Sequence, residues 1–329
     1  MNYKNSLRRL AGVVVAGTVL ALAAGSALAQ AHKGKKVILL GADDICEYCA
    51  VYNDAVRKFA KDAGIELELV TNKFDAAQQA AQVEQAIAKK PDAILLWTID
   101  GTALFPAMRK VKAAGIPLLL TDVEPDMKMS DLWIQYTGGN YEGSGRLAAQ
   151  LMVDAFKAKG LGTSGDIILI TGIIGQAQTM SIDKGFREEL KKLAPGIRIV
   201  GSQPGNWDTG TATEAATGLF TKYGKNIKGI YSHEDLMLQG ALVAAERAGI
   251  DLKTLAAVGR GCEPAGIANI KAGRQYATTK QSPIDEARYA IDSVVNHFAG
   301  KKMEKSVYVP MPKVTAANVD QECQAWPKR

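Results

Sequence analysis

Short apolar segments alternate with longer segments of helical spacing along the first half of the chain. The apolar segments are predicted strands: Val37–Leu40, Ile65–Val70, Ala93–Trp97 and Pro117–Thr121. The segments between them are predicted helices: Ala50–Ala63, Ala76–Lys89 and Leu104–Ala114. The strands are apolar on both faces, which is typical of a sheet that helices cover on each side. The pattern predicts a doubly wound α/β domain.

The second half of the chain repeats this alternation. Its predicted strands are Ile167–Thr171, Ile197–Gly201, Ile227–Ser232 and Leu255–Gly259. Its predicted helices are Met180–Leu193, Thr211–Tyr223, Leu236–Ala248 and Pro264–Ala272. The segment KKPDAILLWTIDGTALFPAMRKVKAAGIPLLLTD resembles KNIKGIYSHEDLMLQGALVAAERAGIDLKTLAAVG of the second half, since both run strand, acidic loop, helix, Ala-Gly-Ile, strand. The length suits about two domains, and we expect two of the same architecture.

The alternation of strand and helix breaks at three places: Gly138-Gly139, Gln281 and Pro310. We interpret these breaks as crossings of the chain between two lobes. They predict an N-terminal lobe of residues 35–138 plus 282–309, and a C-terminal lobe of residues 139–281 plus 310–329. Ligands of doubly wound domains bind outside the carboxyl ends of the strands, so we expect one cleft between the lobes.

The first 29 residues have the pattern of a cleaved signal peptide. Lys4, Arg8 and Arg9 precede an apolar run, and Ala27-Leu28-Ala29 forms a cleavage site of the A-x-A kind. An uncleaved anchor is the alternative, but the run is short for a membrane span, which needs roughly 20 apolar residues. We therefore expect export to the periplasm, where disulfides can form.

Charge and motifs exclude several classes of function. The net charge of +6 falls to near +3 once the three signal-peptide cations leave, and this excess is spread over the chain, so nothing indicates nucleic-acid binding. No Gly-rich nucleotide fingerprint, nucleophile elbow or H-E-x-x-H motif is present. The three histidines lie far apart in the sequence and the single C-x-x-C has no second pair. We expect no cofactor, no metal and no catalytic site.

The residues that follow the predicted strands carry carboxylates, amides and aromatic rings. Carboxylates accept hydrogen bonds from hydroxyls, and flat rings pack on apolar C–H faces, so together they suit a sugar or polyol. Each of these side chains has an ordinary alternative. Asp235 and Asp208 are interpreted as helix N-caps, and Trp97 could fill the core.

Four segments carry a resemblance to a known family: GSQPGNWDTGTATEAATGLFTKY, IYSHEDLMLQGALVAAERAG, GIPLLLTDVEPD and MPKVTAANVD. Over nearly all the mature chain, the sequence resembles type I periplasmic binding proteins, in particular the ribose-binding subunit of ABC importers. The resemblance implies two Rossmann-like lobes joined by three crossings, hinge closure on the ligand, and no catalysis. It also implies a membrane permease as partner, and we expect a monomer.

The resemblance also assigns residues to the site. It implies stacking aromatics at Tyr48 and Trp207, and polar contacts from Asp122, Glu234 and Gln281. The expected ligand-binding set is Asp44, Cys46, Tyr48, Trp97, Asp122, Gln178, Met180, Trp207, Glu234, Arg260 and Gln281. Three positions depart from the family. Val123 and Met180 stand where sugar binders often have Arg, and Gly261 stands where an acid is common, so ribose cannot be transferred as the ligand.

The four cysteines have three possible roles: disulfides, a redox centre or free thiols. Cys46 and Cys49 lie at a strand-to-helix junction, where a helix N-terminus lowers thiol pKa values, so position alone does not exclude redox work. The length of the chain and its resemblance favour a loop-rigidifying disulfide between them. Cys262 and Cys323 would then pair in the second lobe and tie the C-terminal tail to a cleft loop.

The leading hypothesis is a periplasmic solute-binding protein that delivers a small polyhydroxylated ligand, a sugar or polyol, to an ABC transporter. The same lobes could instead present a ligand to a chemoreceptor or sensor kinase. A repressor is disfavoured by the signal peptide and the missing helix-turn-helix, and a thiol oxidoreductase by the rest of the chain. Because acids outnumber cations near the cleft, we expect a neutral ligand first, an amino sugar second, and no binding of sugar phosphates or sugar acids.

Overall fold

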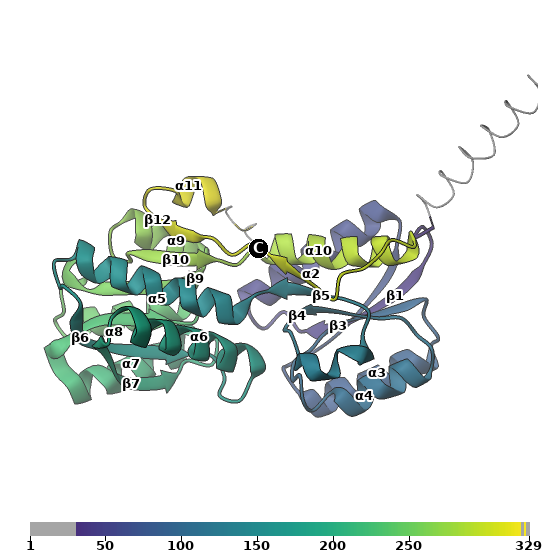
Figure 1. The fold of residues 1–329 in the computed structure, drawn as a ribbon, viewed down its shortest axis with the longest axis horizontal. Coiled ribbons are helices and arrows are strands. Elements are labelled where there is room, and N and C mark those ends of the chain that lie inside the picture. The colour runs from purple at the N-terminus through teal and green to yellow at the C-terminus, as the bar shows by residue number, and fades with distance from the viewer. Residues whose placement is uncertain (1–30, 324–325, 327–329) are drawn as a thin grey trace, which may run out of the picture.

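The computed structural model describes residues 31–323 and Trp326, and contains two sheets of six strands each (Figure 1). The predicted signal peptide lies outside the described residues. Within them, no helix is long and apolar enough to cross a bilayer. The two sheets confirm the two doubly wound units that the alternation of strands and helices predicted.

The first sheet has the order β11-β5-β4-β3-β1-β2, and all its paired strands are parallel. We call this sheet and its helices the N-terminal lobe. Its strands are β1 Lys36–Ala42, β2 Glu66–Asn72, β3 Ala93–Trp97, β4 Leu118–Asp122, β5 Tyr136–Gly139 and β11 Ser306–Val309. Its helices are α2 Glu47–Ala63, α3 Ala76–Ala88, α4 Phe105–Ala113 and α10 Pro283–Phe298, with a 3-10 helix, η1, at Met127–Leu132.

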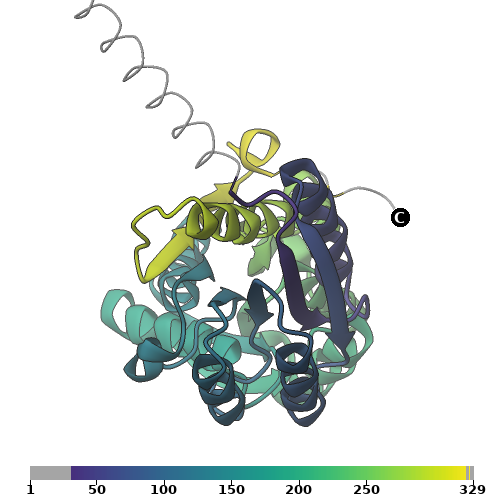
Figure 2. The same cartoon turned by 90° about the vertical axis from the view of Figure 1, so that its right-hand side faces the viewer.

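Alternate residues of the central strands enter two separate cores in this lobe. Leu39 and Leu95 pack with α2 and α10, whereas Leu40 and Leu96 pack with α3 and α4. Figure 2, which faces this lobe, shows helices on both sides of the strands. The double-sided burial explains why these strands are continuous apolar runs.

The second sheet has the order β12-β10-β9-β8-β6-β7 and is parallel except for the antiparallel pair β10–β12. We call this sheet and its helices the C-terminal lobe. Its strands are β6 Ser164–Thr171, β7 Gly196–Pro204, β8 Ile227–Ser232, β9 Ala256–Gly261, β10 Ala277–Lys280 and β12 Lys313–Thr315. Its helices are α5 Tyr141–Ala158, α6 Ala177–Leu193, α7 Thr209–Tyr223, α8 Asp235–Arg247, α9 Pro264–Lys271 and α11 Val319–Glu322, with 3-10 helices η2 Gly224–Asn226 and η3 Leu252–Thr254. The pairs α5/α6 and α7/α8 cover opposite faces.

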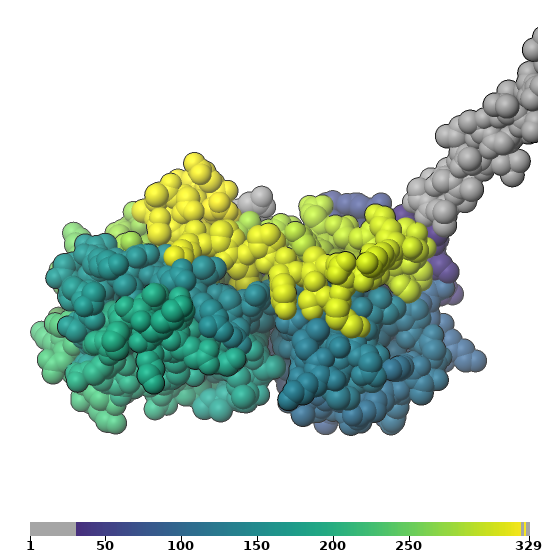
Figure 3. Space-filling model, viewed as in Figure 1, coloured from purple at the N-terminus to yellow at the C-terminus, as the bar shows by residue number. Residues whose placement is uncertain are grey.

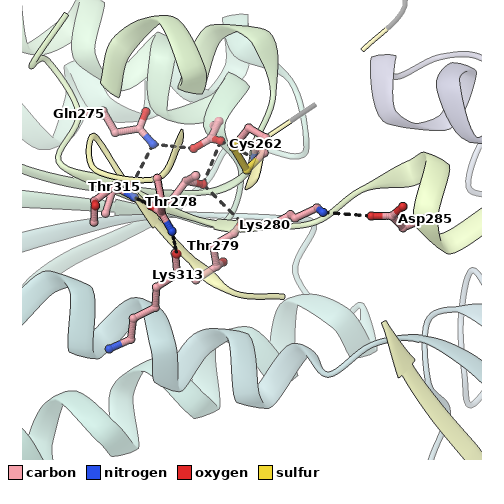
Figure 4. The surroundings of a disulfide bond; sticks show 12 residues. Cys262, Gln275, Thr278, Thr279, Lys280, Asp285, Lys313 and Thr315 are labelled. Atoms are coloured by element: carbon pink, nitrogen blue, oxygen red, sulfur yellow. Dashed lines mark hydrogen bonds and ion pairs between the residues drawn. A yellow bond between two sulfur atoms is a disulfide. The ribbon is translucent and has the colours of Figure 1, made fainter. Parts of the chain in front are cut away.

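Three connections run between the two sheets: from β5 to α5, from β10 to α10 and from β11 to β12 (Figure 1). Figure 3 shows the yellow C-terminal part of the chain lying over both lobes. At the second of them, Lys280 Nζ of β10 lies 3.2 Å from Asp285 Oδ2 of α10 (Figure 4). These connections coincide with the breaks at Gly138-Gly139, Gln281 and Pro310, and they support the predicted lobe bounds, which we keep as a proposal.

The sequence pattern missed some elements and shortened others. The expected series omitted β5, α5, β10, α10, β11, β12 and α11. Strand β5 is only four residues long and ends in two glycines, so it has no apolar run to reveal it. Strand β6 begins at Ser164, and the apolar pattern missed its first three residues because they are Ser, Gly and Asp and are less buried than the rest of the strand. One tail residue also departs from the predicted bounds: Trp326 packs in the core of the N-terminal lobe, with Val51 and Trp97.

Candidate ligand-binding site

A cavity of about 550 Å³, including its opening to solvent, lies between the carboxyl ends of the two sheets. The cavity is lined by Cys46, Tyr48, Cys49, Phe74, Trp97, Ile99, Asp122, Val123, Gln176, Gln178, Trp207, Glu234, Arg260 and Gln281. These residues lie at the carboxyl ends of strands, in the loops that follow them or at the starts of the next helices, and they belong to β1, β2, β3, β4, β6, β7, β8, β9 and β10, as the strand-end rule predicts.

Aromatic rings from both lobes face this cavity. In the N-terminal lobe, the rings of Tyr48 and Trp97 meet edge to face with centroids 6.0 Å apart. In the C-terminal lobe, Trp207 Nε1 donates to Gln176 Oε1 at 2.8 Å, which fixes the plane of the indole. Both kinds of ring can pack on the apolar faces of a sugar.

The backbone before helix α7 aims the indole of Trp207 at the cavity. Asn206 and Trp207 have φ angles of 55° and 60°, in the left-handed region that few non-glycine residues adopt. The indole then lies against Gly172, where an added Cβ would come within 1.9 Å of the ring. Gly172 is therefore required for Trp207 to occupy this position.

The N-terminal wall presents Asp122 backed by Glu286. Asp122 ends β4 with a φ of 64° and is buried, and Tyr141 Oη donates to its Oδ1 at 3.2 Å. Glu286, in α10, accepts from Tyr48 Oη at 2.6 Å and from Gln281 Nε2 at 3.1 Å. Burial raises the pKa of both carboxyls, and the adjacent Asp122 charge raises the pKa of Glu286 further. The two groups hydrogen-bond, so Glu286 holds a proton that it donates toward Asp122.

The C-terminal wall contributes Arg260, the only buried Lys or Arg among the described residues. Its Nε donates to the carbonyl oxygen of His233 at 2.8 Å. The guanidinium lies 5.5 Å from the ring centroid of Tyr141 and 5.9 Å from that of Trp207, at cation–π distance. Burial lowers the pKa of His233 well below its ordinary value, so this imidazole is neutral. The positive charge of the wall therefore resides on Arg260.

A second pair of carboxyls stands on the C-terminal wall. Glu234 lines the cavity and is partly buried, and burial raises its pKa to about 7. Behind it, Glu263 is buried and hydrogen-bonds to Glu234, and burial together with the Glu234 charge raises the pKa of Glu263 well above its ordinary value. Glu263 also accepts from the backbone N–H of Leu236. Each wall thus has a cavity-facing carboxyl backed by a buried glutamate.

The interpretation of Asp235 as a helix N-cap is wrong. Its carboxylate accepts from the backbone N–H of Cys262 at 3.0 Å, from Gln275 Nε2 at 2.7 Å and from Thr278 Oγ1 at 3.0 Å. Gln275 and Thr278 are shown beside Cys262 in Figure 4. Asp235 therefore ties α8 to β9 and β10 behind the cavity. The N-cap interpretation holds for Asp208, which accepts from the backbone N–H of Thr211 at 2.7 Å.

Both expected disulfides are present, Cys46–Cys49 and Cys262–Cys323, and none of the chain's four cysteines is free. Cys46 is the N-cap residue of α2, so the first disulfide closes the first turn of the helix that carries Tyr48 in the cavity wall. No cluster of His, Cys, Asp and Glu side chains in the described part of the chain is arranged to hold a metal ion.

Every residue of the expected ligand-binding set lines this cavity except Asp44 and Met180. Asp44 is exposed and accepts from Asn53 Nδ2 at 2.8 Å. Met180 is 61% exposed on α6 and lines a wider groove outside the cavity. Val123, which was noted only as a departure from the family pattern, does line the cavity.

Sequence reasoning missed Phe74, Ile99 and Gln176 in the lining. All three follow strands, so the rule that selected Trp97 could have selected them too. It also missed Glu286 and Glu263 behind the walls. Glu286 lies inside a helix and Glu263 caps another, and neither position differs in sequence from an ordinary surface glutamate.

Comparison with known proteins shows which family the chain belongs to. The family model described as periplasmic binding protein domain matches residues 46–302. The chain is similar to the xylitol-binding protein of Mycolicibacterium smegmatis, with 26% identity over 96% of this chain and 88% of that protein. It is similar to the D-ribose/D-allose-binding protein of Pseudomonas aeruginosa, with 25% identity over 94% of this chain and 98% of that protein.

Solved structures show the same fold. A periplasmic solute-binding protein of an ABC transporter from Actinobacillus succinogenes, with bound D-allose, has a TM-score of 0.78 and 27% identity over 87% of this chain and 99% of that one. A galactofuranose-binding protein has a TM-score of 0.80 and 22% identity over 88% of this chain and 97% of that one.

Proposed function

Because the chain belongs to the periplasmic binding protein family, we propose that it captures a small polyhydroxylated ligand, a sugar or polyol, in the cavity between its lobes. We further propose that it delivers this ligand to the membrane permease of an ABC importer, and that it does so as a monomer without catalysing a reaction. The similar proteins named for xylitol and for ribose and allose support this ligand class.

One observation carries the proposal: a buried polar atom at the cavity wall lacks a partner among the described residues. It is Nη1 of Arg260, a hydrogen-bond donor. A buried polar group without a hydrogen bond costs roughly 1–3 kcal/mol. A hydroxyl oxygen of the ligand can accept from this atom, and a neighbouring hydroxyl of the same ligand can donate to the carboxylate of Asp122.

The balance of charge supports a ligand without anionic groups. The cavity lining contains the carboxyls of Asp122 and Glu234 and the single cation Arg260. Val123 and the distant Met180 supply no cation where sugar binders often place one. A phosphate or carboxylate on the ligand would meet like charge in a partly dry cleft, which is unfavourable.

The proposed location is the periplasm, which the family implies, after export by the signal peptide predicted in residues 1–29. The mature chain would then begin near Gln30. Mass spectrometry of the exported protein tests this, since an intact N-terminal methionine would contradict it.

A thermal-shift screen of sugars, polyols, amino sugars, uronic acids and sugar phosphates tests the ligand class. A ligand at about 100 times its Kd should stabilise the protein by roughly 2.7 kcal/mol. Calorimetric titration of each hit gives its affinity. We expect hits among neutral or amino compounds. Tight binding of a uronic acid or a sugar phosphate, or no hit among the polyhydroxylated compounds, would contradict the proposal.

A further inference from the structure

The C-terminal tail is attached to both lobes within a few residues. Cys323 is bonded to Cys262, which directly follows β9 of the C-terminal lobe, and both are buried with Val314 and Val319 (Figure 4). Three positions later, Trp326 is buried in the core of the N-terminal lobe. The tail therefore joins the lobes a fourth time, in addition to the three connections between the sheets.

The ring of Trp326 contacts a residue of the cavity wall. Its centroid lies 6.1 Å from that of Tyr48, with the planes at 70°, an edge-to-face contact. Tyr48 also meets Trp97 edge to face and donates to Glu286. Trp326 thus packs behind the ring that faces the cavity, and it does so from a tail that is anchored to the opposite lobe.

The length of the chain between the two anchors is short. Residues 323 and 326 are three Cα steps apart, and a fully extended chain spans at most about 10–11 Å over that distance. Hinge opening moves the walls of the cleft apart. Any opening that moves Cys323 farther than this from the buried position of Trp326 must pull Trp326 out of the N-terminal core, which costs the burial of a large aromatic side chain.

From these contacts we propose that the tail is a strap that limits opening of the cleft, and that Trp326 is a positioning residue for Tyr48. The strap needs both anchors: the Cys262–Cys323 disulfide on one lobe and the Trp326 contact on the other. It acts without ligand, so it goes beyond the proposed function and does not depend on which ligand binds.

The test uses ligand-free full-length protein and three variants. They are Trp326→Ala, the double variant Cys262→Ser with Cys323→Ser, and the combination of all three substitutions. Gln321→Ala, at an exposed position of the same tail, is the matched control. Small-angle X-ray scattering measures the separation of the lobes. Hydrogen exchange at the Ala50 amide, which donates to Cys46 O at 3.0 Å, measures the order of the first turn of α2, which holds Tyr48.

Each of the first two variants should enlarge the radius of gyration and speed exchange at Ala50 by about tenfold or more. The combined variant should differ little from either of them, because releasing one anchor already releases the strap. The control should match the parent protein. Trp326→Phe keeps a ring, so its scattering and exchange should lie close to those of the parent protein. This variant serves if Trp326→Ala does not fold.

An unchanged scattering profile and unchanged exchange in the double serine variant would overturn the strap, whatever Trp326→Ala does to the melting temperature. Additive effects in the combined variant would also overturn it, since they would mean that the two anchors act separately. None of these readouts uses a ligand, so they stand or fall independently of the ligand screen.

Discussion

The two walls of the cavity use the same arrangement of carboxyls but differ in what surrounds it. On the N-terminal wall, Asp122 is backed by Glu286; on the C-terminal wall, Glu234 is backed by Glu263. Among the described residues that line the cavity, only the C-terminal wall carries a cation, Arg260. Only the N-terminal wall has a disulfide in its first loop, Cys46–Cys49.

This difference separates two roles in recognition. The N-terminal wall is a rigid set of acceptors, since Asp122 is fully buried and fixed by Tyr141. The C-terminal wall brings the donor and an adjustable acceptor, since Glu234 is partly exposed and has a pKa near neutrality. Two similar lobes thus supply complementary halves of one site. The following predictions test this difference, from the largest expected effect to the smallest.

Arg260→Met should have the largest effect. It removes the one cation in the described lining of the cavity and leaves Glu234 and Asp122 with uncompensated charge. Breaking a buried charge arrangement of this kind typically costs about 3–5 kcal/mol. We expect ligand affinity to fall more than 100-fold in calorimetric titration. Arg260→Lys keeps the charge but not the flat guanidinium between Tyr141 and Trp207, and it should recover only part of the loss. Wild-type affinity in Arg260→Met would show that the cation has no role in binding.

Glu234→Gln sharpens the question of ligand charge. If the bound compound carries an amine held by this carboxylate, affinity should fall by roughly 2–5 kcal/mol, the range for one partner lost from a buried charge pair. If the compound is neutral, the loss should be smaller, because an amide oxygen still accepts from a hydroxyl.

The matched variant on the other wall is Asp122→Asn, titrated with the same compounds. A drop confined to amine ligands in only one of the two variants would identify the wall that holds the amine. Equal, small losses with every compound would argue against any charged contact.

Trp207→Ala should weaken binding while the ligand-free protein stays folded. The expected loss is roughly 1–3 kcal/mol, the scale of burying a large apolar side chain. Trp207→Phe keeps a flat face but loses the hydrogen bond to Gln176, so its ligand affinity should lie between those of the wild-type protein and Trp207→Ala. Titration calorimetry with a compound from the screen measures this, and unchanged affinity in the alanine variant would remove Trp207 from the site.

The stability of the ligand-free protein should fall as pH rises from 5 to 8. Burial raises the pKa of Glu234 from 4.5 to about 7 and that of Asp235 from 3.8 to about 6, so the folded state holds protons that the unfolded chain releases. Stability from these groups is present below their unfolded pKa values and is lost as pH rises through the folded ones.

We expect a decrease of about 1–2 kcal/mol in the free energy of unfolding over this range, below the full linkage value because Glu234 is partly exposed. Denaturant unfolding at several pH values measures it. Glu234→Gln should flatten the dependence, and a free energy that rises with pH in this window would refute the assignment.

The sequence by itself determined the architecture and most of the cavity lining. Strands such as Val37–Leu40 and Ala93–Trp97 are apolar on both faces, and only a sheet covered on both sides buries them. Because parallel strands place their carboxyl ends at one edge, position after a strand was enough to select Trp97, Asp122 and Arg260.

Tertiary structure alone decided which carboxyls are paired. Asp122 and Glu286 are separated by more than 160 positions, and they share a proton only because α10 returns to the N-terminal lobe after the chain has built the other one. Asp235 shows the same limit: its position before a helix favoured an N-cap, but β10 lies close enough for Thr278 to compete for the carboxylate. Local sequence cannot reveal such partners, because hydrogen bonds and pKa values depend on which distant groups folding brings within about 3 Å.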